Sequence, residues 1–142
     1  MVKNLQINYS GKTGFNKRII HSIVGYLKNE LNFSINEVAV NFISSREITY
    51  LNIKYLNHNN STDIITFNYS GNNSELDGEI FISVDDCRNN AQTFGVKFDE
   101  EMVRLLIHGF LHLLGYDDKN KLEKKKMFDL QENLLNNCKF AI

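Results

Sequence analysis

Two histidines one helical turn apart are the residues of this sequence most able to do chemistry. His108 and His112 are four positions apart in a strongly periodic apolar segment, and Arg104 lies one turn before them. On an α-helix this spacing puts both imidazoles on one face, close enough to share an ion. Imidazole is a common ligand for zinc and other divalent metals. The pair therefore predicts a metal site on this helix.

A third ligand is expected just beyond the helix. Gly115 suits the left-handed conformation that closes many helices, so the chain can turn back toward the histidines there. Within residues 116–119, tyrosine and charged lysine are poor ligands, which leaves the carboxylates of Asp117 and Asp118. The spacing of ten from the first histidine favours Asp118, with Asp117 as its rival. Three protein ligands and one open position are typical of catalytic zinc.

The same spacing occurs in the long zinc-protease motif, with one difference. Those enzymes carry a glutamate directly after the first histidine as general base, and this chain has Gly109 there. A metallopeptidase-like hydrolase is therefore an alternative that lacks its base. An iron oxygenase with two histidines and one carboxylate is a more distant alternative. In the non-functional alternative, the histidines only pack against or cap their helix.

A cluster of lysines follows the histidine segment directly, although the net charge of the whole chain is only −1. It allows two interpretations. The cluster is either a solvated helix face or a patch that contacts phosphates beside the metal site. Its members are Lys119, Lys121, Lys124, Lys125 and Lys126.

Alternating and helical patterns of apolar residues indicate the elements that position these groups. The expected strands are residues 5–9, 38–43, 62–69 and 78–84, and the expected helices are residues 15–31, 48–55, 85–94, 99–114 and 121–137. The last two strands are expected to form an antiparallel hairpin, and Asp99 to be the N-cap of the histidine helix. We therefore predict one α/β (α+β) domain over residues 1–142, with a mixed, mostly four-stranded sheet and about five helices.

The composition indicates an ordinary globular protein. Apolar residues make up 42% and charged residues 23% of the 142 residues, and no segment approaches the ~20 apolar residues of a membrane span. The first residues, Met1 to Asn4, lack the apolar core of a secretion signal, so a cytoplasmic location is expected. Cys87 and Cys138 are then expected to be packed thiols rather than a disulfide.

Residues 108–117, His-Gly-Phe-Leu-His-Leu-Leu-Gly-Tyr-Asp, resemble the signature of the YbeY family of endoribonucleases, the ribosomal RNA maturation factors. Supporting segments occur in the family's order, and the resemblance covers residues 36 to 135. These segments are Leu51-Asn52 before Tyr55, Thr-Asp-Ile-Ile-Thr-Phe at 62–67 and Gly-Glu-Ile-Phe-Ile at 78–82.

The resemblance implies an endoribonuclease that depends on one divalent metal ion, with zinc as the expected metal, and that cleaves single-stranded RNA. It implies a role in maturation of the small-subunit (16S) ribosomal RNA and in ribosome quality control. The expected partners are single-stranded ribosomal RNA and the small ribosomal subunit, with neither DNA nor a membrane. A non-catalytic RNA-binding factor in ribosome assembly is the alternative from another class.

The sequence departs from the family pattern at two positions. The family motif usually ends in a third histidine, where this chain has Asp118. A carboxylate is a harder ligand than imidazole and adds negative charge, so the identity of the metal is less determined by the motif. Many members carry an arginine where this chain has Leu56. Either His58 or Arg104 would then take over contact with the phosphate, or activity would be reduced.

The resemblance and the residue chemistry together assign the expected roles. His108, His112 and Asp118 are the metal ligands. Asp63 and His58 are the two candidates for a catalytic acid or base, with a structural hydrogen-bonding role as the alternative for Asp63. The RNA backbone is expected to contact four basic residues, Arg104, Lys119, Lys121 and Lys124.

Overall fold

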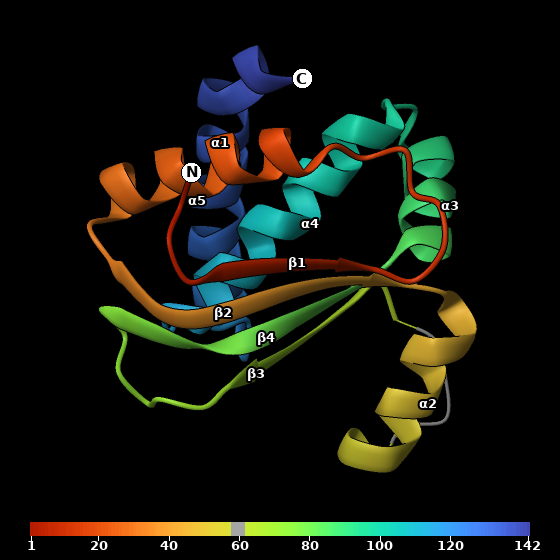
Figure 1. The fold of residues 1–142 in the computed structure, drawn as a ribbon, viewed down its shortest axis with the longest axis horizontal. Coiled ribbons are helices and arrows are strands. Elements are labelled where there is room, and N and C mark those ends of the chain that lie inside the picture. The colour runs from red at the N-terminus through yellow and green to blue at the C-terminus, as the bar shows by residue number, and fades with distance from the viewer. Residues whose placement is uncertain (58–61) are drawn as a thin grey trace.

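A four-stranded mixed sheet forms the centre of the fold (Figure 1). The computed structural model describes residues 1–57 and 62–142. The strand order is β1-β2-β4-β3, in which the first three are parallel and β3 runs antiparallel to β4. The strands are β1 (Leu5–Tyr9), β2 (Ser34–Ile43), β3 (Ile64–Asn68) and β4 (Glu75–Ser83).

Helices cover the two faces of the sheet unequally. In Figure 1, α1, α4 and α5 lie on one face, α3 stands beside α4, and α2 lies alone on the other side. The helices are α1 (Lys17–Leu31), α2 (Ser45–Leu56), α3 (Val84–Phe94), α4 (Phe98–Leu113) and α5 (Lys121–Cys138), followed by a 3₁₀ turn, η1 (Lys139–Ala141). The main core therefore lies between the sheet and α1, α4 and α5.

The alternation of side chains along β4 explains the two faces. Leu76, Ile80 and Ile82 are buried in the main core, because successive residues of a strand point to opposite faces. Phe81 points the other way and packs against a smaller cluster that includes Ile48 of α2. The sheet thus has a fully covered face under α4 and a partly covered face under α2.

Helix α4 is the buried central helix, and Gly109 sets how closely it approaches the sheet. A Cβ atom at this position would lie 2.9 Å from Cγ2 of Ile80 and 3.1 Å from Cδ1 of Ile64. Any larger side chain would push α4 away from β3 and β4. Since His108 and His112 are on the same helix, this close approach also brings them to the edge of β3.

The structure confirms the predicted fold class, with four strands in a mixed sheet and five α-helices in the described chain. The hairpin is also confirmed, with Thr66 opposite Ile80. The largest boundary difference is in β2, which begins at Ser34 rather than at residue 38. The prediction of Asp99 as N-cap is wrong. Helix α4 begins one residue earlier, and the acidic group lies in its first turn, where it stabilises the positive end of the helix dipole.

Two further expectations concern the whole chain. None of the described helices is long and apolar enough to cross a bilayer. Cys87 and Cys138 are both free and buried, which confirms that they are packed thiols. Burial raises the pKa of Cys87 to about 12, with smaller contributions from Glu101 and Asp63, so this thiol stays protonated and unreactive.

Candidate metal centre

His108 and His112 meet at one end of a cleft beside β3. Their Nε2 atoms are 3.0 Å apart, and their rings are nearly perpendicular, at 80°. One ligand atom from each histidine and one from Asp118 all lie within 4.8 Å of one another. The structure therefore brings together the three residues that the sequence predicted as ligands, and this group could hold a metal ion.

The distance between the two histidine nitrogens fits a shared ion. Two nitrogens bound to one tetrahedral zinc at about 2.05 Å lie about 3.3 Å apart, close to the 3.0 Å seen between the Nε2 atoms of His108 and His112. Asp118 is exposed, so its carboxylate can close on an ion without disturbing the core. Two imidazoles and one carboxylate form a donor set that suits zinc and its neighbours.

The protonation state of His112 also suits ligation. Burial in the cleft is the main cause that lowers its pKa, and the neighbouring His108 adds to the effect. The Asp118 carboxylate and a hydrogen bond to the backbone of Tyr116 oppose this shift. The net result is that His112 is neutral near pH 7, which is the form that binds a metal.

The turn after α4 brings Asp118 to the histidines. Gly115 has a φ of 97°, a conformation that side chains other than glycine rarely adopt. The amide of Gly115 donates to the carbonyl of His112, and that of Tyr116 to the carbonyl of Leu111, so the last turn of the helix is closed. A Cβ at position 115 would also collide with Asn73, at 2.7 Å. The predicted reversal at this glycine is confirmed.

Asp117 faces a different set of partners. Its Oδ1 accepts the backbone N–H of Asp118 at 2.7 Å, and its Oδ2 lies 3.5 Å from Nζ of Lys119. These contacts occupy the carboxylate that rivalled Asp118 as third ligand. The geometry therefore favours Asp118, ten residues after His108, over Asp117 as the third ligand.

The cleft joins the ligand cluster to β3 and to the end of α2. Its volume is about 570 Å³. Leu56, at the position where many family members have arginine, lines the cleft and is 45% exposed, so this wall carries no positive charge there. The lining residues are Asn52, Leu56, Thr62, Asp63, Ile64, Ile65, Thr66, His108, His112 and Asp118.

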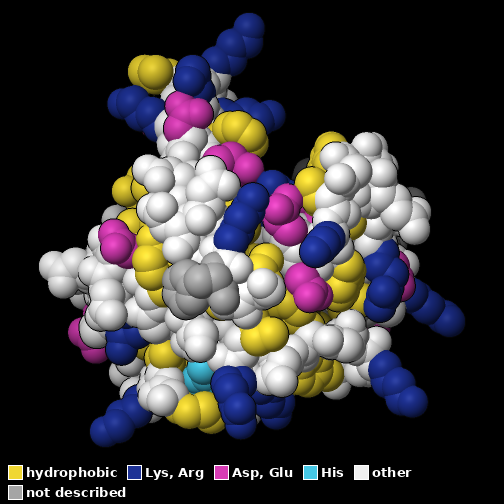
Figure 2. Space-filling view, turned by 90° about the horizontal axis from the view of Figure 1, so that it is seen from above, with side chains coloured by type: hydrophobic (Ala, Val, Ile, Leu, Met, Phe, Trp, Pro, Cys, Tyr) yellow, Lys and Arg dark blue, Asp and Glu magenta, His cyan; other side chains and the backbone are white. Residues whose placement is uncertain are grey.

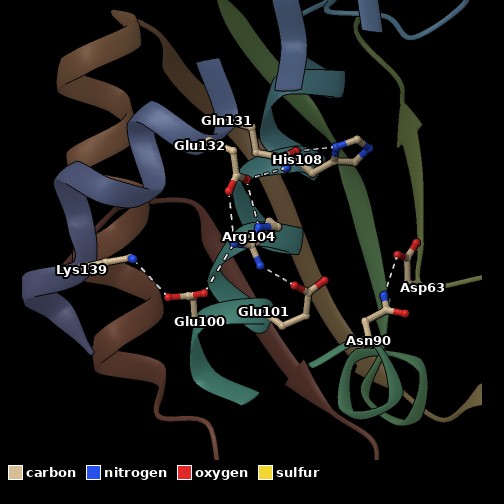
Figure 3. A network of polar contacts seen from close by, with 9 residues as sticks. All are labelled: Asp63, Asn90, Glu100, Glu101, Arg104, His108, Gln131, Glu132 and Lys139. Carbon is tan, nitrogen blue, oxygen red and sulfur yellow. Dashed lines mark hydrogen bonds and ion pairs between the residues drawn. The ribbon is translucent and has the colours of Figure 1, made fainter. Parts of the chain in front are cut away.

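Asp63 lies on the cleft wall, where the sequence placed a candidate acid or base. Its Oδ2 accepts a hydrogen bond of 3.1 Å from Nδ2 of Asn90, a contact visible in Figure 3. The side chain of Asn90 also hydrogen-bonds Glu101 of α4. Asp63 is therefore held by α3 in the same cleft as the ligand cluster. The other candidate, His58, lies outside the described residues.

Arg104 does not line the cleft, and carboxylates surround its guanidinium (Figure 3). Nη1 of Arg104 is 2.6 Å from Oε1 of Glu101, and Nε is 2.9 Å from Oε2 of Glu132. Nη2 is 3.5 Å from Oε2 of Glu100. Glu100 also pairs with Lys139 at 3.2 Å. This arrangement is at odds with the expected phosphate contact, because the donors of Arg104 are already used within the protein.

The lysines after the turn are exposed, as both sequence interpretations required. Lys119 lies beside Asp118, and Lys121 and Lys124 are in the first turns of α5. Figure 2 shows basic side chains interspersed with acidic and hydrophobic ones, without one continuous basic surface on that face. Lys119 directly follows Asp118 in the chain, and contact of the three lysines with a phosphate chain stays a prediction.

Sequence reasoning missed two residues that support the site. Gln131 contacts His108 at 2.7 Å, and Asn90 holds Asp63. A signal for Gln131 was present. It lies midway between Met127 and Leu135 in the buried stripe of α5, and a polar residue in an apolar stripe requires a partner. No comparable signal marked Asn90, because α3 is polar on most of its surface.

Comparisons with known proteins identify the family of this chain. The family model described as Endoribonuclease YbeY matches residues 2–139. The Bacteroides thetaiotaomicron protein named Endoribonuclease YbeY is 42% identical over 101 residues, which cover 71% of this chain and 73% of the relative. The protein of the same name from Chlorobaculum tepidum is 33% identical over 129 residues, which cover 91% and 93% of the two chains.

A solved structure supports the same relationship. The solution structure of a Thermotoga maritima protein has a TM-score of 0.68 and 26% sequence identity, and the match covers 94% of this chain and 88% of that one. The family match over nearly the whole chain, the curated relatives and the shared fold lead to one conclusion. The chain belongs to the YbeY family of endoribonucleases.

Proposed function

We propose that this protein is a zinc-dependent endoribonuclease that cleaves single-stranded RNA in the maturation of small-subunit ribosomal RNA and in ribosome quality control. The observation that carries the proposal is the convergence of His108, His112 and Asp118 at the end of a cleft in a member of this family. The relatives are named as endoribonucleases. The small ribosomal subunit and its RNA are the proposed partners.

The shape and chemistry of the cleft favour a flexible strand as substrate. The two histidines are partly buried, so a scissile phosphate must enter the cleft to reach them. An unpaired strand can turn its backbone inward, whereas a duplex presents a rigid surface. Thr62 and Thr66 offer hydroxyl groups on the wall, and the exposed Lys119 offers positive charge next to Asp118 in the chain.

The mechanism assigns one task to each group. His108, His112 and Asp118 would hold the zinc ion, which, when bound, polarises a phosphoryl oxygen and lowers the pKa of a water molecule. Asp63 takes up at its carboxylate the proton that the attacking water loses, as the water oxygen bonds to phosphorus, and returns it to the RNA oxygen whose P–O bond breaks. Asn90 keeps that carboxylate directed at the cleft. The lysines that follow Asp118 would hold the RNA backbone.

The proposal is tested by metal analysis together with cleavage of an unstructured ribosomal RNA fragment. Purified protein should hold one zinc per chain, and chelation should stop cleavage until zinc is returned. His112→Ala should lose both the metal and cleavage, whereas His21→Ala should keep both, because His21 lies away from the cleft and accepts from Val2. Cleavage that survives chelation and the His112→Ala change would refute the proposal.

A second candidate function is an RNA-binding assembly factor without turnover. The observation that favours it is Leu56 on the cleft wall, because leucine cannot stabilise the charge that develops on a phosphate. In that case chelation would lower the thermal stability and leave RNA binding unchanged at matched salt. Zinc-loaded protein would then bind the fragment without cutting it.

The peptidase alternative has a structural argument against it. A glutamate in place of Gly109 would point into the sheet, where a side chain of Ile80 already lies 2.9 Å from the place that its Cβ atom would take. The helix face that carries the histidines is a different one. Zinc-loaded protein is therefore expected to leave unstructured peptides intact under conditions in which it cuts RNA.

A further inference from the structure

A chain of polar contacts runs from Arg104 to the metal-facing histidine (Figure 3). Arg104 binds both oxygens of Glu132, through Nε at 2.9 Å and through Nη2 at 3.1 Å. Oε2 of Glu132 accepts Nε2 of the adjacent Gln131 at 3.2 Å. Oε1 of Gln131 then lies 2.7 Å from Nδ1 of His108. Helix α5 therefore holds a residue of the ligand cluster on α4.

The chain has a direction that its chemistry determines. An ionised carboxylate only accepts hydrogen bonds, so Glu132 must face the amino group of Gln131. The amide oxygen of Gln131 is consequently turned toward His108. An amide oxygen also only accepts, so Nδ1 of His108 must carry a proton and donate it. The neutral ring then has its lone pair on Nε2, which faces Nε2 of His112.

The burial of Gln131 leaves this side chain little choice of hydrogen-bond partners. Gln131 is only 6% exposed, so water cannot easily replace either of its partners. A buried amide that lacks its hydrogen bonds is costly. The glutamine could not simply rotate its amide, because its oxygen would then face the Glu132 carboxylate. The bidentate Arg104 pair keeps that carboxylate in place.

We propose that Gln131 is a positioning residue that holds His108 in its Nδ1–H tautomer, with the Arg104–Glu132 pair fixing the orientation of the glutamine. This inference rests on the proposed metal site, and it explains what the buried polar contacts between α4 and α5 do. Ring orientation and tautomer are set before a metal arrives, so binding does not have to select the correct form of the ligand.

The first test reads the tautomer directly in metal-free protein. Long-range ¹H–¹⁵N correlation spectra at pH 8 should show His108 as the Nδ1–H form. Gln131→Met should remove this preference, since a methionine side chain cannot take the place of the amide oxygen that accepts the Nδ1 proton. Glu100→Gln is the matched control, because Glu100 contacts Arg104 but is not in the path to His108. Its spectrum should match that of the unchanged protein.

The second test is zinc affinity in a competition titration with a chelating dye. Gln131→Met should weaken zinc binding by about 10-fold or more, the usual effect of losing a group that orients a metal ligand. The zinc affinity of Glu100→Gln should be unchanged, because Glu100 is not in the path to His108. An Nε2–H tautomer in the unchanged protein, or an Nδ1–H signal that persists in Gln131→Met, would overturn the proposal.

The two tests separate this inference from the proposed function. If the unchanged protein binds no zinc but shows the Nδ1–H tautomer that Gln131→Met abolishes, the positioning role stands and the metal proposal fails. If zinc binds and the tautomer is insensitive to Gln131→Met, the metal proposal stands and the positioning role fails. Circular dichroism of each variant establishes that the comparison is made between folded proteins.

Discussion

Arg104 and His108 lie one turn apart on α4, yet their surroundings are opposite. Arg104 is surrounded by Glu100, Glu101 and Glu132, so carboxylates of the protein itself neutralise its positive charge. The cluster of His108 and its two partner ligands instead opens onto a cleft. The ion cluster around Arg104 is closed, so it stabilises the packing of α5 on α4. The second has ligand atoms directed at one another with an exposed carboxylate beside them, which is what a binding site requires.

The difference shows how one helix serves two purposes. A closed ion cluster fixes α5 against α4, and through Gln131 it reaches the first histidine of the open cluster. The polar contacts thus hold His108 from the side of α5, and the cleft leaves access where the proposed ion and phosphate would enter. Variants of the closed cluster should accordingly act first on stability, and variants of the proposed ligands should act first on metal binding.

The largest effect is expected at the centre of the closed cluster. Arg104→Met leaves the carboxylate of Glu101, which is 3% exposed, and that of Glu132 without their cation. Removal of one partner from a buried ion cluster destabilises a protein by about 3 kcal/mol. Urea denaturation measures the loss, with Lys125→Met as control for the exposed pair with Asp129. Zinc stoichiometry should stay at one. If Arg104→Met and Lys125→Met are equally stable, the carboxylates around Arg104 do not form a buried ion cluster that stabilises the fold.

The next effect concerns the open cluster and its third ligand. Asp118→Asn should weaken zinc binding about 10-fold, or about 1.4 kcal/mol, and leave the free energy of unfolding of metal-free protein unchanged. Asp118→His should restore affinity, because imidazole is a good zinc ligand. Asp117→Asn is the matched control, since Asp117 is occupied by Lys119. If calorimetry finds Asp117 to be the sensitive position, the register of the third ligand is wrong.

The sequence alone predicted the open cluster because its information is local. His108, His112, Gly115 and Asp118 lie within eleven residues, and helix periodicity with a glycine turn is enough to bring them together. The hairpin of β3 and β4 was predictable for the same reason. Its alternating pattern and its short connection are both read from adjacent residues.

The closed cluster could not be predicted in this way. Glu132 is 28 residues from Arg104, and their contact depends on how α5 crosses α4, which periodicity does not specify. Arg104 was therefore assigned to RNA, because an unpaired arginine near a metal motif is the simplest interpretation of sequence alone. The contact of Asn90 with Asp63 spans 27 residues and was missed for the same reason.

A smaller effect should distinguish the lysines from Arg104. In the described part of the chain, Lys121 and Lys124 form no ion pair, and Lys119 has only the exposed Asp117. Each phosphate contact adds about 0.7 to the salt dependence of single-strand binding. Neutralising all three to glutamine should lower the slope by about 2, measured by fluorescence anisotropy across salt concentrations. The matched control changes Lys3, Lys12 and Lys17 to glutamine, and it should leave the salt slope unchanged. An unchanged slope in the first variant would make the cluster a solvated face.

The smallest effect lies inside the closed cluster, where two carboxylates on the same arginine respond to burial differently. Burial is the main influence on Glu101 and raises its pKa above 4.5, despite the contacts with Arg104. Burial also opposes ionisation of Glu132, but hydrogen bonds from Arg104 and Gln131 outweigh it and lower the pKa. The side chain of Glu132 is 28% exposed against 3% for Glu101, so water still solvates one of the two charges.

The two groups should therefore give opposite pH dependence. A raised folded-state pKa contributes stability below the unfolded value that is lost as pH rises through the folded pKa, so Glu101 favours the folded state at low pH. Glu132 contributes stability above pH 4.5 that is lost as pH falls. Relative to the unchanged protein, Glu101→Gln should gain stability between about pH 4 and pH 7.5, and Glu132→Gln should lose it. Urea denaturation of metal-free protein at both pH values tests this. Parallel changes in the two variants would show that Arg104 holds both carboxylates equally.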